Sequence, residues 1–372
     1  MKLQSVIIQN VVNALATKTT KKIVVIESDD WGAIRMPSKE TYNALLSKRI
    51  ISETDPFAKF DCLEREDDLI GLFEVLTSVQ DSQGQAAKMT ANCIMANPDF
   101  AKIQEANFEA YYFESVVDTF ANHTKHGDCL WLWNEGYRKN IFIPQLHGRE
   151  HVNVGLWLAA LQDKDNAFLE AFTHQTYAIN NQVAASLGWS KKKMEYNPAE
   201  SVMEGALMFE ALFGKSSATF IAPNYTWDRS IEHALYESNI MCLQGSKKQN
   251  IPALDSASVK QRYHYLGQKN KREQIYLVRN CLFEPSVSDK VDYLNLCLSQ
   301  IKNAFLWKAP AIICSHRLNF MGYMDAANRD RNLLLLQQLL KSIVKYWPDV
   351  VFMSTVDLLE ELHQPKNSGL QS

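Results

Sequence analysis

Residues 22–32 read KIVVIESDDWG, and this stretch decides the fold. The residues up to Glu27 form a short, continuous run rich in β-branched side chains, which is typical of a strand buried on both faces. The run ends in the polar cluster Ser28, Asp29 and Asp30. A strand buried on both faces belongs to a parallel sheet, and the functional groups of such sheets collect beyond the carboxyl ends of the strands. We therefore expect the two aspartates to lie at a functional site.

Further runs of the same kind follow along the chain, separated by helical patterns. The strand-like runs lie at residues 88–95, 140–146, 218–223, 240–244, 309–315 and 350–354. Helical periodicity covers residues 67–79, 152–161, 199–213, 229–238, 290–305 and 331–346. Strands that alternate with helices indicate parallel βαβ units, and the lack of a Pro-, Gly- or Ser-rich linker favours one barrel over two packed domains. The sequence thus predicts an α/β protein with a single (β/α) barrel over residues 1–372.

Three segments interrupt this alternation. Residues of about 38–65 and 168–196 are predicted to be long loop insertions, which in barrels often form the walls of the site. Residues 262–283 predict two aromatic-rich strands around a turn, ending in the polar pair Arg279 and Asn280.

Composition and charge exclude several classes of protein. Of the 372 residues, 46% are hydrophobic and 22% are charged, which is ample for a buried core and excludes a disordered chain. The formal net charge of -3 supplies no basic field, so we expect no nucleic-acid partner. There is no apolar window of about 18 residues and no recognisable export signal at the N-terminus. We therefore expect no membrane span and a cytoplasmic location.

The seven cysteines are an odd number and include no CxxC pair. This pattern indicates buried, reduced thiols rather than disulfides or a thiolate zinc site. A metal ion in this protein would therefore need histidine and carboxylate ligands.

Two histidines after one predicted strand are candidates for such ligands. His147 and His151 are four residues apart, which places both imidazoles on one face of a helical turn, where they can bind one divalent ion. Gly148 follows the first histidine, so the spacing is not the HExxH of a metalloprotease. The alternative interpretation is a pair of surface or helix-capping histidines.

Asp29 and Asp30 are candidates for the carboxylates. Two adjacent carboxylates raise each other's pKa when they are buried, and a cation relieves this repulsion. Their side chains leave an extended backbone in different directions, so one can bind metal while the other serves as a general base. The alternative is an Asp cap or Asx turn between strand and helix. His316 ends a later strand and is either an acid opposite the metal or a structural hydrogen-bonding residue.

Four motifs resemble, in the same order, those of the NodB-type polysaccharide deacetylases, carbohydrate esterase family 4. They are Asp29-Asp30 after a strand, His147-x-x-x-His151, residues 220–225 (FIAPNY) and residues 313–316 (ICSH). The resemblance implies a distorted (β/α) barrel with about seven parallel strands. It also implies a divalent metal, zinc first and Co²⁺, Ni²⁺ or Mn²⁺ as alternatives, held by Asp30, His147 and His151. Asp29 would be the base and His316 the acid in hydrolysis of an N- or O-acetyl group on a carbohydrate.

The chain departs from the family pattern at two of these motifs. Ala222 stands where the family has the arginine that orients the catalytic aspartate, and Gly148 stands where it has Ser or Thr. Arg149 or Arg317 would replace that arginine, unless both are surface ion-pair residues. The Tyr225 amide matches the family's position for a backbone N–H that binds the oxyanion.

Other residues near the predicted strand ends suit a sugar substrate. Aromatic side chains stack on sugar faces, and polar side chains hydrogen-bond to sugar hydroxyl groups. The candidates for substrate binding are Trp31, Arg149, Tyr225, Arg279, Asn280 and Arg317, with Trp227, Glu284 and Asn319 as neighbours. Each is also explained by ordinary packing or ion pairing.

Two other functions stay open from the sequence. The first is a barrel glycoside hydrolase with two carboxylates on either side of a sugar cleft. Its candidate carboxylates are Asp29 or Asp30 with Glu135, Glu150 or Glu284. The second is a catalytically silent relative that binds a sugar or a protein partner, because Ala222 leaves the base without its arginine.

Overall fold

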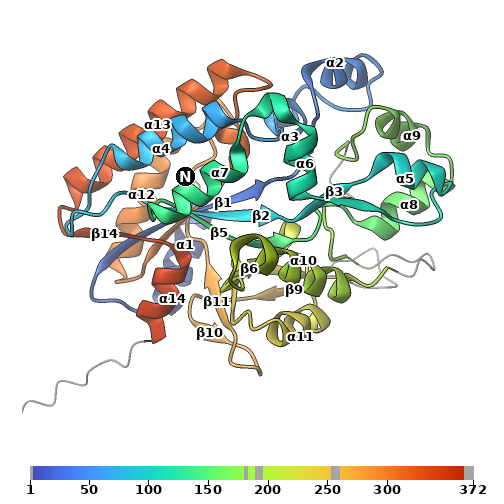
Figure 1. Ribbon diagram of the computed structural model, residues 1–372. Helices are drawn as coiled ribbons and strands as arrows, with labels where there is room; N and C mark the ends of the chain where they lie inside the picture. Colours follow the sequence, from blue (N-terminus) through green and yellow to red (C-terminus); the bar gives the residue numbers. More distant parts are fainter. Residues whose placement is uncertain (1–2, 180–182, 189–195, 253–259, 364–372) are drawn as a thin grey trace, which may run out of the picture.

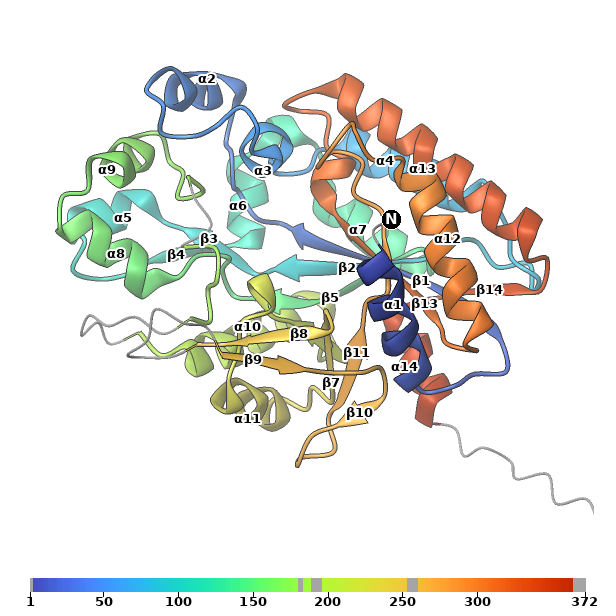
Figure 2. The same ribbon diagram turned by 180° about the vertical axis from the view of Figure 1, so that it is seen from behind.

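A ten-stranded, mostly parallel sheet forms the centre of the computed structural model, which describes residues 3–179, 183–188, 196–252 and 260–363 (Figures 1 and 2). Its strands are β1 (Lys22–Trp31), β2 (Met89–Ile94), β5 (Phe142–Gly148), β6 (Thr219–Ile221), β7 (Cys242–Gly245), β10 (Gln268–Lys269), β11 (Ile275–Val278), β12 (Cys281–Leu282), β13 (Ala311–His316) and β14 (Val350–Met353). Neighbouring strands follow the order β10-β11-β7-β6-β5-β2-β1-β13-β12, and β14 pairs with β1 beside this path. Within the sheet only the pairing of β10 with β11 is antiparallel.

Helices surround the sheet, and α4, α12 and α13 lie side by side on its outside (Figure 1). The described helices are α1 (Leu3–Leu15), α2 (Lys39–Ser47), α3 (Pro56–Phe60), α4 (Glu66–Thr77), α5 (Phe100–Glu105), α6 (Val116–Asn122), α7 (Cys129–Arg138), α8 (Val154–Gln162), α9 (Asn166–Thr173), α10 (Pro198–Phe213), α11 (Arg229–Glu237), α12 (Tyr293–Leu306), α13 (Ala326–Tyr346) and α14 (Thr355–His363). Two small antiparallel sheets pair β3 (Ala96–Pro98) with β4 (Phe113–Ser115), and β8 (Lys248–Ile251) with β9 (Lys260–Tyr263).

The predicted α/β class with parallel strands is confirmed. The strand-like runs coincide with β1, β2, β5, β6, β7, β13 and β14, and the helical patterns coincide with α4, α8, α10, α11, α12 and α13. The predicted insertion at 38–65 contains α2 and α3. The predicted insertion at 168–196 begins within α9, and its residues 180–182 and 189–195 lie outside the described residues.

The barrel closes through the chain itself at residues 279 and 280. The strands β11 and β12 lie near opposite edges of the sheet but are separated in sequence by these two residues alone. The Arg279 amide donates to the Gly245 carbonyl oxygen of β7 at 2.9 Å, and the Asn280 amide donates to that of Ile312 in β13 at 3.1 Å. The backbone therefore joins the two sides of the sheet where no strand pairing does.

The Asn280 side chain secures this crossing. Its Nδ2 donates to Asn13 Oδ1 in α1 at 2.8 Å and to the Pro310 carbonyl oxygen at 2.9 Å, and its Oδ1 accepts from the Ile312 amide at 2.8 Å. The side-chain amide is thus committed to the seam of the barrel. The structure therefore gives Asn280 a role in the seam, and its predicted role in substrate binding stays a prediction.

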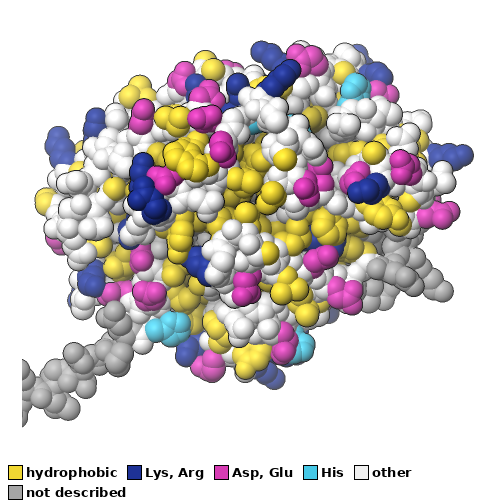
Figure 3. All heavy atoms as spheres, in the orientation of Figure 1, with side chains coloured by type: hydrophobic (Ala, Val, Ile, Leu, Met, Phe, Trp, Pro, Cys, Tyr) yellow, Lys and Arg dark blue, Asp and Glu magenta, His cyan; other side chains and the backbone are white. Residues whose placement is uncertain are grey.

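The surface mixes basic, acidic and apolar side chains on the face that Figure 3 shows. None of the described helices has both the length and the apolar character needed to cross a bilayer.

We expect N280A to lower the free energy of unfolding by about 1–3 kcal/mol, because it removes three hydrogen bonds that hold the seam. Urea denaturation measures this. N295A is the matched control, since Asn295 is exposed at the start of α12 and bonds locally to Asp292. A loss no larger in N280A than in N295A would contradict the role of Asn280.

Candidate active site

A bulge near the end of β1 brings both aspartates to the mouth of the barrel. The register of β1 with β2 shifts between Ser28 and Trp31, and Asp30 has a φ of 77°, which residues with a side chain rarely adopt. A bulge inserts one residue and re-aims its neighbours, and strained backbone of this kind collects at functional sites. Asp29 and Asp30 therefore both reach functional partners, although alternation in a regular strand would point them apart.

The same bulge turns Trp31 into the core. Its side chain is buried, its ring meets Phe142 edge-on at 5.0 Å between centroids, and its Nε1 donates to Ser28 Oγ at 3.1 Å. The prediction that Trp31 stacks on a sugar is wrong, because no face of the ring reaches solvent.

Asp30, His147 and His151 bring three potential metal ligands together. Asp30 Oδ1 lies 3.1 Å from His147 Nε2 and 3.2 Å from His151 Nε2. The three ligand atoms lie within 4.8 Å of one another. All three side chains are buried, so the surface or capping interpretation of these histidines does not hold.

The hydrogen bonds of this group suit a cation. His147 Nδ1 donates to the Ile221 carbonyl oxygen at 2.9 Å, so in the neutral ring the lone pair of Nε2 faces the Asp30 carboxylate. Burial outweighs the nearby carboxylate and lowers the pKa of His151 to about 3, so the His151 ring is neutral. Its Nδ1 is buried and has no hydrogen-bond partner among the described residues. Two imidazole nitrogens and one carboxylate oxygen form an open, catalytic type of zinc site, and these residues fit a divalent metal.

A chain of buried charges holds the other oxygen of Asp30. Arg35 Nη1 lies 3.0 Å from Asp30 Oδ2, and Arg35 Nε lies 3.4 Å from Asp61 Oδ2. Arg317 then donates to Asp61 Oδ1 at 2.9 Å and to Glu64 Oε2 at 2.7 Å. Arg317 is fully buried, so it is neither a substrate-binding residue nor the replacement for the missing arginine.

Arg279 orients Asp29. Its Nη1 and Nη2 donate to the two carboxylate oxygens of Asp29 at 2.7 Å each, and its Nε donates to Glu27 Oε2 at 2.6 Å. Asn92 Nδ2 also donates to Asp29 Oδ1, at 2.8 Å. Burial raises the pKa of Asp29, but Arg279 outweighs it and the pKa falls to about 2. Arg279, and not Arg149 or Arg317 as expected, therefore holds the Asp29 carboxylate. The predicted contact of Arg279 with a sugar stays a prediction.

His316 lies beside Asp29 and is held by Glu284. Its Nδ1 donates to Glu284 Oε1 at 2.6 Å, and its Nε2 lies 3.7 Å from Asp29 Oδ2. Burial opposes protonation, but Glu284 outweighs it, with a contribution from Asp29, and the pKa of His316 rises well above its usual value. Asn319 Nδ2 donates to Glu284 Oε2 at 2.8 Å, which fixes that carboxylate. His316 is thus a protonated acid next to an ionised carboxylate, with 23% of its side chain exposed.

A second group of potential ligands, Glu284, Cys314 and His316, lies nearby. Burial raises the pKa of the Cys314 thiol, so the thiol stays protonated. Since the Nδ1 of His316 is already bound to Glu284, this group is better suited to acid catalysis than to a metal.

Two predicted substrate ligands lie elsewhere or are already engaged. The Arg149 guanidinium points away from the metal ligands, forming ion pairs with Glu150 and Glu204. The Tyr225 amide, predicted to bind an oxyanion, donates instead to the Ala222 carbonyl oxygen at 2.9 Å. The Tyr225 hydroxyl lies 3.4 Å from Arg279 Nη1, so its side chain remains next to the base.

The helix α10 supports the turn that carries the two histidines. A Cβ on Gly205 would lie 2.8 Å from the Arg149 backbone nitrogen and 3.2 Å from the Gly148 carbonyl carbon. No side chain fits into this contact without a shift of backbone, so glycine allows α10 to pack directly behind the turn.

No family model and no curated protein matches this sequence. Solved structures similar to it include a Pseudomonas aeruginosa PAO1 protein named as a probable polysaccharide deacetylase, at 9% identity and a TM-score of 0.48, covering 93% of this chain and 92% of that one. The Puue allantoinase has 10% identity and a TM-score of 0.45, covering 92% and 91%. The 4-alpha-glucanotransferase of Thermococcus litoralis has 8% identity and a TM-score of 0.45, with 92% of this chain matching 40% of that one.

We expect D30N and H151Q each to weaken zinc binding about 100-fold or more, because each removes one of three ligands. Competition with a chelating dye measures the affinity, and circular dichroism checks the fold. H233Q is the control, since His233 lies exposed on α11. Wild-type zinc affinity in both ligand variants would contradict the assigned site.

Proposed function

We propose that this protein is a metal-dependent carbohydrate deacetylase that hydrolyses an N- or O-acetyl group. The observation that carries the proposal is that side chains suited to three roles lie close together at one mouth of the barrel. Asp30, His147 and His151 are the proposed metal ligands, Asp29 is the general base and His316 is the general acid.

The division of labour follows from the contacts of each side chain. Zinc bound by the three ligands would supply polarisation of the acetyl carbonyl and a more acidic water. Asp29 accepts the proton of the attacking water, while Arg279 keeps its carboxylate fixed and ionised. His316, protonated through its contact with Glu284, donates a proton to the leaving nitrogen or oxygen. With 3.7 Å between His316 Nε2 and Asp29 Oδ2, both groups reach one acetyl group.

The choice of an acetylated carbohydrate as substrate rests on the four motifs and their order, which resemble those of the NodB-type deacetylases. Ala222, the main departure from that pattern, is compensated by the bidentate contact of Arg279 with Asp29. An oriented base favours an active enzyme over a silent relative.

The glycoside hydrolase alternative lacks a suitable second carboxylate. Glu135 forms an ion pair with Arg138 on α7, and Glu150 accepts from Arg149 on the side away from the metal ligands. Glu284 is bound to His316. Each candidate partner of the aspartates is therefore committed to another role.

Acetate release tests the proposal. The zinc-loaded protein is incubated with N-acetylated and O-acetylated mono- and oligosaccharides, before and after chelation and after reloading with zinc. We expect acetate release that disappears on chelation and returns on reloading. Release of reducing sugar without acetate would instead support the glycoside hydrolase.

We expect D29N to lower turnover about 100- to 10,000-fold while zinc content stays near one equivalent, because the base is lost but the ligands remain. Acetate release and elemental analysis of the same sample measure both quantities. D118N, an exposed aspartate on α6, is the control. Turnover in D29N equal to that in D118N would show that Asp29 is not the base.

We expect E284Q to shift the alkaline limb of the pH profile of kcat/KM downward by about one pH unit or more. Glu284 raises the pKa of His316, so the protonated acid persists at neutral pH and is lost as the pH rises through that pKa. Without the carboxylate, burial lowers the pKa of His316, and Asp29 and Asp30 alone oppose this effect. E273Q, an exposed change elsewhere, should leave the profile in place. If the alkaline limb of the kcat/KM profile is the same in E284Q as in the wild type, that limb reports a group other than His316.

A further inference from the structure

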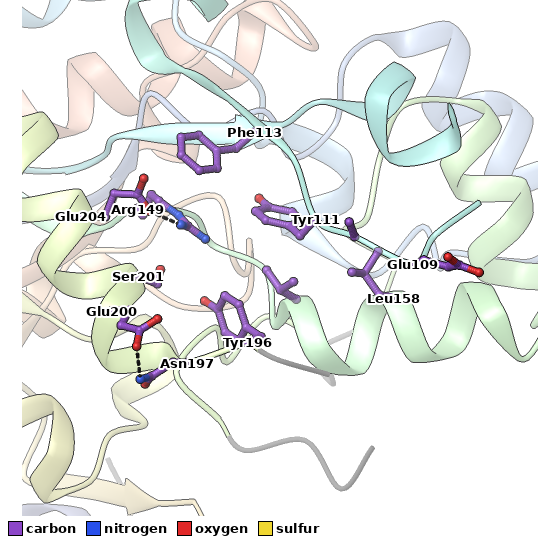
Figure 4. A pocket seen from close by; sticks show the side chains of 12 residues that line it. Glu109, Tyr111, Phe113, Arg149, Leu158, Tyr196, Asn197, Glu200, Ser201 and Glu204 are labelled. Carbon is purple, nitrogen blue, oxygen red and sulfur yellow. Dashed lines mark hydrogen bonds and ion pairs between the residues drawn. The ribbon is translucent and has the colours of Figure 1, made fainter. Parts of the chain in front are cut away.

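A cavity of about 350 Å³ is lined by Arg149, which lies in the turn between His147 and His151 (Figure 4). Its walls come from the loop before β4, from the turn itself, from α8 and from the first two turns of α10. Three aromatic rings and three carboxylates line it, from Tyr111, Phe113, Tyr196, Glu109, Glu200 and Glu204. This lining differs from that of the metal group, which is formed by the imidazoles of the same turn.

Carboxylates outnumber cations among the described residues that line the cavity. Arg149 is the one cation in this described lining. Its guanidinium stacks on the Phe113 ring at 4.4 Å from the centroid and forms ion pairs with the buried Glu150 and with Glu204. The charge of Arg149 is therefore already balanced by its partners. Asn197 Nδ2 donates to Glu200 Oε1 at 2.9 Å, but no ion pair of Glu200 with a cation is found among the described residues, so this carboxylate can attract a cationic ligand.

One aromatic side chain offers an unused polar group. The Tyr196 hydroxyl donates to Glu150 Oε1 at 2.6 Å, as does Ser201 Oγ at 2.7 Å. The Tyr111 hydroxyl, by contrast, is buried and has no hydrogen-bond partner in the part of the chain that the structure describes. Figure 4 shows this hydroxyl pointing toward the side of the cavity that Arg149 occupies. A buried hydroxyl without a partner is unfavourable, and a ligand that bonds to it removes the penalty.

We propose that this cavity binds a protonated amino sugar. The rings of Tyr111 and Tyr196 suit the apolar face of a sugar, the Tyr111 hydroxyl suits a sugar hydroxyl, and the Glu200 carboxylate suits the ammonium group. The volume lies within the range of small-molecule sites and holds one sugar ring. The choice of an amino sugar among organic amines rests on the proposed function, because deacetylation of an N-acetylated sugar yields this ammonium group. The ligand is either a free monosaccharide or one deacetylated residue of a glycan.

Calorimetry on the zinc-loaded full chain tests the proposal with glucosamine, N-acetylglucosamine and glucose. We expect glucosamine to bind about 10-fold more tightly than the two uncharged sugars, and less tightly as salt increases. We expect E200Q and Y111F each to weaken glucosamine binding about 5-fold or more, while E273Q leaves it unchanged. Thermal denaturation verifies that both variants are folded.

Equal affinity for glucosamine and N-acetylglucosamine, or wild-type affinity in both E200Q and Y111F, would overturn the proposal. Titration with glucosamine oligosaccharides shows whether the ligand is a free monosaccharide or a residue of a glycan. Tighter binding of the oligosaccharides than of glucosamine identifies a glycan residue, and equal binding identifies the free sugar. The same titrations on D29N, which lacks the proposed base, measure glucosamine binding independently of turnover. They therefore separate this inference from the proposed function. Glucosamine binding without any acetate release in the wild type would refute the deacetylase alone, and acetate release without glucosamine binding would refute this site alone.

Discussion

The buried ion pairs of Arg279 are the interaction on which both the closure of the barrel and its chemistry depend. The residue stands at the seam where the chain crosses between the edges of the sheet, and its guanidinium contacts Glu27 and Asp29 across the mouth. Removing one member of a buried ion pair leaves an uncompensated charge, which is strongly destabilising. Burial raises the pKa of Glu27, so this carboxyl depends on Arg279 to be charged. The position of Asp29, the proposed base, is thereby tied to the closure of the fold.

The insertion after β1 takes part in the site through charge. Asp61 and Glu64 come from this insertion, and Arg317 from the segment after β13. With Arg35 they form an alternating series of buried charges that ends at Oδ2 of Asp30. The insertion predicted to form a wall of the site therefore also supports Asp30, the proposed metal ligand.

The sequence predicted the fold well where the signal was local. Continuous apolar runs located β1 and its neighbours, and their polar ends located Asp29, His147 and His316, because parallel strands end at one rim. The role of Arg279 was missed, since it depends on which edges of the sheet meet, and hydrophobic periodicity does not encode that. The one sequence feature that pointed to Arg279 was its position, with Asn280, at the end of a predicted strand.

The placement of Trp31 and the seam role of Asn280 have equally specific causes. Trp31 was predicted to face a sugar because it follows Asp30 at a strand end, but after the bulge its side chain lies in the core. Asn280 also lies at a strand end, and its side-chain amide holds the seam. Neither feature can be recognised from the amino-acid sequence. The φ of 77° at Asp30, and the two-residue connection by which the chain crosses between the edges of the sheet, are visible only in the structure.

The close approach of α10 to the histidine turn has a consequence for comparing sequences. Because a single methyl group at position 205 would collide with the backbone of Arg149, any sequence with a larger residue there must have moved the helix or the turn. A relative that keeps both histidines but lacks this glycine would therefore hold them in a different geometry. A glycine at position 205, although it is not itself part of the site, thus marks sequences in which the two histidines are held as they are here.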